Sequence, residues 1–93
     1  MEDRVYLINL YDYYGKLLTE KQQNYFEDYY FDNLTMEEIA ENDLVSKNAI
    51  SKQIINIKEK LNYYESILKL YSNRLEIEKK LDKEYFDRII DYI

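Results

Sequence analysis

The side chains best suited to chemistry lie in one short basic stretch that follows Ser46. A helix that begins there would turn four polar residues outward: Lys47, Asn48, Ser51 and Lys52. Lysine can contact guanine or a phosphate, and asparagine can pair with the edge of adenine. The pattern predicts a surface that reads nucleic acid. The alternative is the solvated side of a packed helix, and the spacing alone fits both equally well.

The residues before and after this stretch predict a helix-turn-helix. Thr35, followed three residues later by Glu38, is the signature of a capping box and opens a short helix. Ser46 is placed to cap the next helix, and Ile50 and Ile54 would hold that helix against a core. Its first turns would then be free to reach base edges, as such motifs require.

The rest of the chain also favours helices. It contains no Pro and a single Gly, Gly15, which disfavours sandwiches and barrels because these need many tight turns. Apolar residues spaced by three and four predict a first helix over about residues 5–18. Thr19 and Gln22 predict a second capping box and a helix over about 20–31. Leu44 and Val45 are expected to fill the space between helices.

A long fourth helix is predicted from Ser46 to about Ser72. Its apolar residues recur at steps of four and three, which is a heptad seam: Ile50, Ile54, Ile57, Leu61, Tyr64, Leu68, Tyr71 and Leu75. The seam outruns the first three helices, so its far half and a C-terminal helix predict a homodimer. We therefore expect a helix-turn-helix domain over residues 1–71 and a C-terminal helical extension over 72–93 that serves dimerisation.

Tyrosines gather in the first two predicted helices. They are Tyr11, Tyr13, Tyr14, Tyr25, Tyr29 and Tyr30. Aromatic rings can stack on nucleobases, but these residues have helical spacing and no interleaved Arg or Lys. We expect them in the core, with the hydroxyls at its edge.

The distribution of charged residues disfavours duplex DNA as the main ligand. The net charge is −6, and residues 1–45 carry three basic against eleven acidic side chains, whereas residues 46–60 are basic. Affinity for duplex DNA comes largely from neutralised phosphates. Five acids on the second and third helices form a solvated face or a surface for a protein partner: Glu27, Asp28, Glu37, Glu38 and Glu41. Charge therefore predicts weak DNA binding at most, and favours a protein or ribonucleoprotein partner.

Several kinds of chemistry are disfavoured by composition. The chain has neither Cys nor His, which excludes disulfides and thiolate metal sites and removes the commonest general base. We expect that the protein is not an enzyme and that it binds neither a cofactor nor a metal. No apolar run approaches the roughly 20 residues that span a bilayer, and the N-terminal residues lack a signal-peptide pattern. We expect no membrane partner and a cytoplasmic location.

Two resemblances sharpen these expectations. Residues 17–61, with a T-x-E-E-I-A helix and the entry LVSKNAIS, resemble the DNA-binding region four of bacterial sigma factors. This implies an all-α, sigma region four-like helix-turn-helix bundle, here with a long fourth helix and a C-terminal helix. A longer stretch, from Leu10 to about Glu65, resembles the YlxM family of small bacterial helix-turn-helix proteins.

The YlxM resemblance implies a role in protein targeting, because members share a genetic neighbourhood with the signal recognition particle. The expected partner is the GTPase of that particle or its complex with RNA. The leading expectation is a regulatory binding protein of this pathway. The alternative is a DNA-binding transcriptional regulator.

Overall fold

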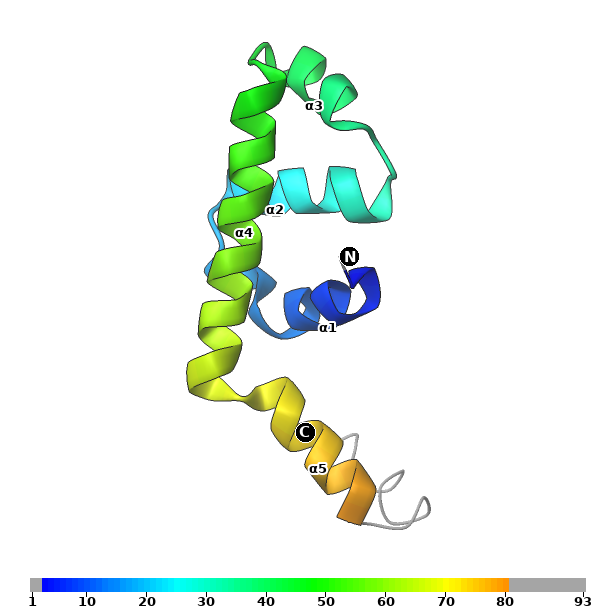
Figure 1. Ribbon diagram of the computed structural model, residues 1–93, viewed down its shortest axis with the longest axis vertical. Coiled ribbons are helices and arrows are strands. Elements are labelled where there is room, and N and C mark those ends of the chain that lie inside the picture. The colour runs from blue at the N-terminus through cyan, green and yellow to red at the C-terminus, as the bar shows by residue number, and fades with distance from the viewer. Residues whose placement is uncertain (1–2, 81–93) are drawn as a thin grey trace.

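The structure is a computed structural model that describes residues 3–80. Every regular element in that range is helical, as the sequence predicts. In chain order they are α1 (Arg4–Tyr14), the 3₁₀ turn η1 (Gly15–Leu17), α2 (Glu20–Phe26), the π-helical segment η2 (Glu27–Phe31), α3 (Met36–Asp43), α4 (Lys47–Leu68) and α5 (Leu70–Lys80). The long helix α4 forms a spine that α1, α2 and α3 pack against, and α5 leads away from its end (Figure 1).

Side-chain caps fix the starts of α2, α3 and α4. Both predicted capping boxes are present: the hydroxyls of Thr19 and Thr35 accept the N–H of Gln22 and Glu38, each at 3.1 Å. The side chains of Gln22 and Glu38 accept the threonine N–H groups in return, also at 3.1 Å. Ser46 caps α4 in the same way, although without the reciprocal bond. Local sequence therefore determines where these helices begin.

Removal of either threonine hydroxyl should have a measurable cost. We expect Thr19→Ala and Thr35→Ala each to lower the free energy of unfolding by about 1 kcal/mol, because one helical N–H loses its acceptor. Denaturant unfolding curves would measure this. Serine at the same positions keeps the hydroxyl and is the control, so an alanine variant as stable as its serine counterpart would contradict the assigned cap.

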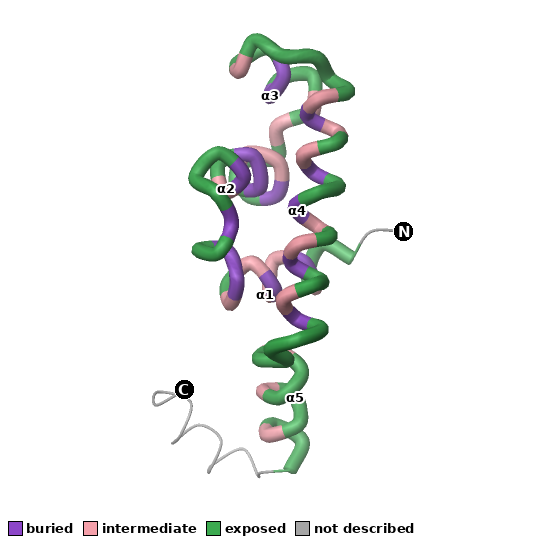
Figure 2. Tube along the Cα trace, turned by 90° about the vertical axis from the view of Figure 1, so that its left-hand side faces the viewer, coloured by how far each residue is buried: buried purple, intermediate pink, exposed green. Residues whose placement is uncertain are grey.

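One apolar core joins the first four helices. Its buried residues are Leu7, Leu10, Tyr14, Leu18, Tyr25, Phe26, Tyr30, Ile39, Ala40, Ile50, Ile54, Ile57 and Leu61. The buried positions follow the faces of α1, α2 and α4 that turn toward one another (Figure 2). The tyrosines lie in or against this core, as expected: Tyr14, Tyr25 and Tyr30 are buried, and the other three pack against them.

Gly15 has a packing role rather than a conformational one. Its φ of −55° is open to any residue. However, a Cβ placed there would lie 2.9 Å from the ring of Tyr11. That ring stacks on Phe26 with centroids 4.1 Å apart. The glycine therefore lets the aromatic stack between α1 and α2 approach the backbone closely.

The expectation for the turn before α4 was wrong. Leu44 is 92% exposed and Val45 is also exposed, so neither fills space between helices. Leu44 adopts the left-handed conformation, with φ 56°, and ends α3. The N–H of Leu44 bonds the carbonyl of Glu41, and the N–H of Val45 bonds that of Ala40. This pair of bonds is the Schellman termination, and it directs the leucine side chain into solvent.

The predicted length of the fourth helix was also wrong. α4 ends at Leu68, Lys69 adopts a left-handed conformation with φ 52°, and α5 starts at Leu70. The heptad seam is buried only as far as Leu61, while Leu68 and Leu75 are exposed. The inward position after Leu61 is held by Glu65, whose carboxylate bonds the start of α5. Residues 81–93 of the expected C-terminal helix lie outside the described residues.

Candidate functional site

The helix-turn-helix is formed by α3, the turn at residues 44–46 and the first turns of α4. α3 lies against the start of α4 at one end of the molecule (Figure 1). Ile39 and Ala40 of α3 are buried with Ile50 and Ile54 of α4. This packing turns the opposite face of α4 outward, which is the face that the sequence predicted to read nucleic acid.

The four predicted reading residues lie on this outer face. Lys47, Asn48 and Lys52 are exposed, and Ser51 is half-buried. The amino group of Lys47 lies 2.9 Å from the carboxylate of Glu37, which precedes it on α3. The hydrogen bond with Lys47 lowers the pKa of the Glu37 carboxyl, and the same contact raises the pKa of Lys47. Both groups stay charged at neutral pH.

This ion pair matters more for binding than for stability. Exposed pairs of this kind contribute little to folding, and both side chains here are more than half exposed. A phosphate that approached Lys47 would nevertheless have to compete with a carboxylate already in contact. Within residues 3–80, Lys52 is then the one predicted reading lysine that makes no ion pair.

A second basic side chain near the site is also engaged. Arg4 donates from its Nη2 to the carbonyl of Tyr30 at 2.8 Å and to Oδ1 of Asn33 at 3.0 Å. These bonds satisfy the end of η2, where Asn33 is left-handed with φ 57°. Arg4 shares a shallow hollow with Glu37 and Lys47, but it serves to hold α1 against η2.

The five acids predicted as a partner surface do not form one face. Glu27 and Asp28 line a groove of about 630 Å³ between α2, η2 and α3. Glu37 lies instead beside Lys47, and Glu38 completes the Thr35 capping box. Glu41 is exposed on α3. The groove also contains three carboxylates that the predicted partner surface did not include, those of Glu20, Asp32 and Asp43.

The groove carries a negative field. Burial raises the pKa of the Asp28 carboxyl, and the negative charges of Asp32 and Glu27 raise it further. One carboxylate oxygen of Glu27, Oε2, accepts a hydrogen bond from the hydroxyl of Tyr11 at 2.7 Å. The cation in the groove, Lys21, is already paired with Asp43. We call this surface the acidic groove.

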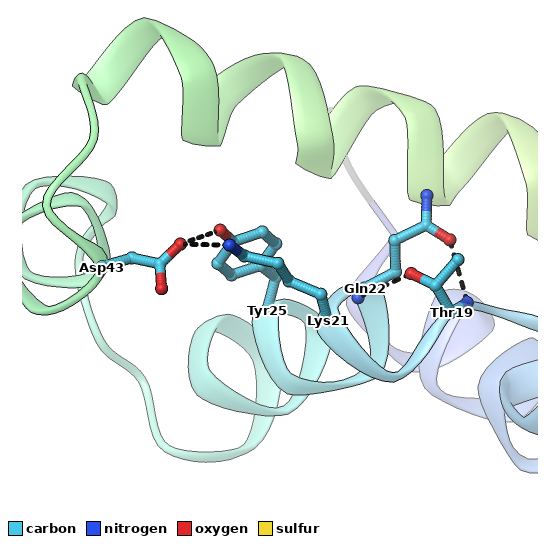
Figure 3. A network of polar contacts seen from close by, with 5 residues as sticks. All are labelled: Thr19, Lys21, Gln22, Tyr25 and Asp43. Atoms are coloured by element: carbon cyan, nitrogen blue, oxygen red, sulfur yellow. Dashed lines mark hydrogen bonds and ion pairs between the residues drawn. The ribbon is translucent and has the colours of Figure 1, made fainter.

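A polar network at one end of the acidic groove ties α2 to α3 (Figure 3). The carboxylate of Asp43 accepts the hydroxyl of Tyr25, and the amino group of Lys21 lies 3.1 Å from the same oxygen. The hydrogen bond from Tyr25 lowers the pKa of the Asp43 carboxyl most, and the contact with Lys21 lowers it further. This network fixes the end of α3, and hence the turn into α4, relative to α2.

Between residues 3 and 80, no group of three or more His, Cys, Asp or Glu side chains is placed to hold a metal ion. No helix in the same range is both long and apolar enough to cross a bilayer.

Comparison with known proteins identifies the family. Residues 1–91 match the family UPF0122, described as "Putative helix-turn-helix protein, YlxM / p13 like". A UPF0122 protein of Clostridium acetobutylicum is 43% identical over 97 residues, covering 98% of this chain and 84% of that protein. One of Malacoplasma penetrans is 40% identical over 86 residues, covering 88% and 80%. One of Fusobacterium nucleatum is 36% identical over 98 residues, covering 98% and 95%. The chain therefore belongs to the UPF0122 family of YlxM-like helix-turn-helix proteins.

Proposed function

We propose that this helix-turn-helix protein is a regulatory binding protein of the signal recognition particle pathway. It would bind the GTPase of the particle, or the complex of that GTPase with RNA, in preference to duplex DNA. The observation that carries the proposal is the Lys47–Glu37 ion pair at 2.9 Å. It places a carboxylate beside the first residue of α4, the helix that would read nucleic acid. The YlxM resemblance supports the choice of partner.

Electrostatics favour a protein or ribonucleoprotein over a duplex. Each phosphate that a protein neutralises makes the slope of log affinity against log salt more negative by about 0.9, and this counterion release supplies most non-specific affinity. The outer face of α4 offers Lys52 without an ion pair and Lys47 bound to Glu37. With Glu41 also exposed on α3, a phosphate backbone would meet as much repulsion as attraction here.

The acidic groove is the surface that suits a basic partner. Glu27, Asp28 and Asp32 bring negative charge to one concave surface beside the helix-turn-helix. Complementary charge mainly speeds encounter and fixes orientation. Basic protein surfaces are expected in a particle that holds RNA, because cations must offset its phosphates. The groove and such a surface are complementary in charge.

A DNA-binding transcriptional regulator is the second candidate. The observation that favours it is the accessibility of the reading face, where Asn48 and Lys52 are exposed on the first turns of α4. Asparagine at such a position can bond adenine in the major groove. The salt dependence of duplex binding separates the two candidates.

Release of Lys47 should strengthen duplex binding. We expect Glu37→Gln to raise the affinity for a random duplex and to steepen the salt slope by about 1, because one more lysine becomes free to neutralise a phosphate. Fluorescence anisotropy over a range of salt would measure both. Glu76→Gln removes the same charge from the exposed surface of α5 and is the control. Equal responses of the two variants would contradict the role assigned to the ion pair.

A further inference from the structure

A buried carboxylate lies at the junction of α4 and α5. Glu65 is the one charged side chain that is buried among residues 3–80. It accepts the hydroxyl of Tyr14 at 2.5 Å and the hydroxyl of Ser72 at 2.6 Å. It also accepts the backbone N–H of Ser72 at 3.0 Å and that of Tyr71 at 3.3 Å. Four donors from two other helices thus converge on one carboxylate of α4.

These bonds cap α5 from outside that helix. The first N–H groups of a helix have no partner within it. Here the N–H of Leu70 donates to the hydroxyl of Tyr14 at 3.0 Å, and those of Tyr71 and Ser72 donate to Glu65. A carboxylate at this end also interacts favourably with the helix dipole. The residue before α5 is Lys69, which offers no local cap, so α5 is capped only while it is docked.

Apolar packing of α5 comes mainly from one residue, Tyr71, which is half-buried against the core. None of the residues of α5 is buried. Its other contacts with α1 are peripheral: the ring of Tyr71 meets the ring of Tyr6 edge-on at 5.9 Å, and Arg74 donates to the hydroxyl of Tyr13 at 3.3 Å. Polar contacts therefore dominate the attachment, in contrast to the apolar core that joins α1 to α4.

The carboxylate remains charged in this position. Burial alone would raise the pKa of Glu65, but the hydrogen bonds from Ser72 and Tyr14 outweigh burial and hold the pKa below its ordinary value. The joint itself is a single residue, Lys69, in a left-handed conformation with φ 52°. Such a conformation is unfavourable for a non-glycine residue and persists where surrounding contacts enforce it.

We propose that α5 is a hinged arm that turns at Lys69, and that Glu65 and Tyr14 form the latch that holds it docked on α1. In the docked state the arm covers Tyr6 and Tyr13 and forms one wall of a groove of about 340 Å³ on α1. In the released state α5 loses its caps, and the groove and these rings open to solvent. The arm lies at the opposite end of α4 from the helix-turn-helix (Figure 1), and the device does not depend on the proposed partner.

Distance measurements on the full chain test the latch. The sequence contains no Cys, so spin labels on Lys16→Cys in η1, directly after α1, and on Glu78→Cys report the separation of this end of α1 from α5 without background. In the parent we expect pulsed electron paramagnetic resonance to give one narrow distribution of distances between the two labels. Glu65→Gln keeps the shape and removes the charge, and should add a longer, broad component. Glu59→Gln, on the exposed face of α4, is the control and should keep the narrow distribution.

Helical content by circular dichroism would show that the body remains folded. A folded Glu65→Gln protein with the parental distribution would overturn the proposal. If Glu65→Gln does not fold, the double variant Tyr14→Phe, Ser72→Ala decides in its place. It removes two donors and the acceptor of Leu70, while the buried ring stays. Release in that variant supports the latch, and an unchanged narrow distribution contradicts it.

Discussion

Replacement of Ile54 by alanine is expected to lower the free energy of unfolding by about 2–5 kcal/mol, the largest stability effect foreseen for this chain. Ile54 is 1% exposed on the inward face of α4, among side chains of the core. The truncation removes apolar contact, and the surrounding helices can close only part of the space. Chemical denaturation monitored by circular dichroism would measure the change.

Ile55 provides a matched control. It is the next residue on the same helix and is 50% exposed, so Ile55→Ala makes the same chemical change on the outer face. A surface change of this kind should stay within about 0.5 kcal/mol. Similar losses for the two variants would mean that the inward face of α4 has been misassigned, and with it the outward position of Asn48 and Lys52.

The parts of the fold that depend on local sequence could be predicted. Capping boxes at Thr19 and Thr35 involve residues three positions apart, so their pattern is visible in the chain itself. The heptad positions from Ile50 to Leu61 were also correct, because α1, α2 and α3 supply apolar partners for them. These features gave the all-α helix-turn-helix fold without reference to distant contacts.

The end of α4 could not be predicted, because it depends on contacts between residues far apart in the chain. Tyr64 and Leu68 continue the apolar spacing, so nothing local indicates a break. Beside the break, Glu65 takes its hydrogen bonds from Tyr14 of α1 and from the start of α5, residues that local sequence does not connect to it. The predicted homodimer rested partly on an unbroken seam from Ile50 to Leu75, and it stays a prediction.

The outward position of the candidate reading residues was predicted, but the contacts of their side chains were not. The reading residues do lie on the outer face of α4, as spacing indicates. The contact between Lys47 and Glu37 depends on the turn at Leu44. This turn is left-handed, but the sequence has no glycine there from which a left-handed residue could be predicted. The predicted acids of η2 and α3 separate because their side chains make different contacts. The side chain of Glu38 forms the capping box with Thr35. The acidic groove is lined by Asp32 and Asp43, and not by Glu38.

The second large expected effect is a difference in affinity between the proposed partner and duplex DNA. We expect the protein to bind the signal recognition particle GTPase, or its RNA complex, at least about 100-fold more tightly than a random duplex at physiological salt, a difference of about 2.8 kcal/mol. The physical reason is the acidic groove together with a reading helix whose first lysine is paired. Reversal of groove charge by Glu27→Lys and Asp28→Lys should slow association with the particle, because complementary charge acts mainly on the rate of encounter.

The control for charge reversal is Glu76→Lys with Glu78→Lys. These residues are exposed on α5, far from the acidic groove, and their replacement makes the same change in net charge. Equal slowing by both double variants would point to net charge rather than to the groove.

Parallel titration of the full chain with the GTPase, with its RNA complex and with a random duplex, all at physiological salt, would distinguish a particle partner from duplex DNA. We expect saturable binding to the GTPase or its complex, a change in GTPase activity, and duplex binding that is weak and lost as salt is raised. Tight duplex binding with no response from either particle component would contradict this expectation and would favour a DNA-binding transcriptional regulator.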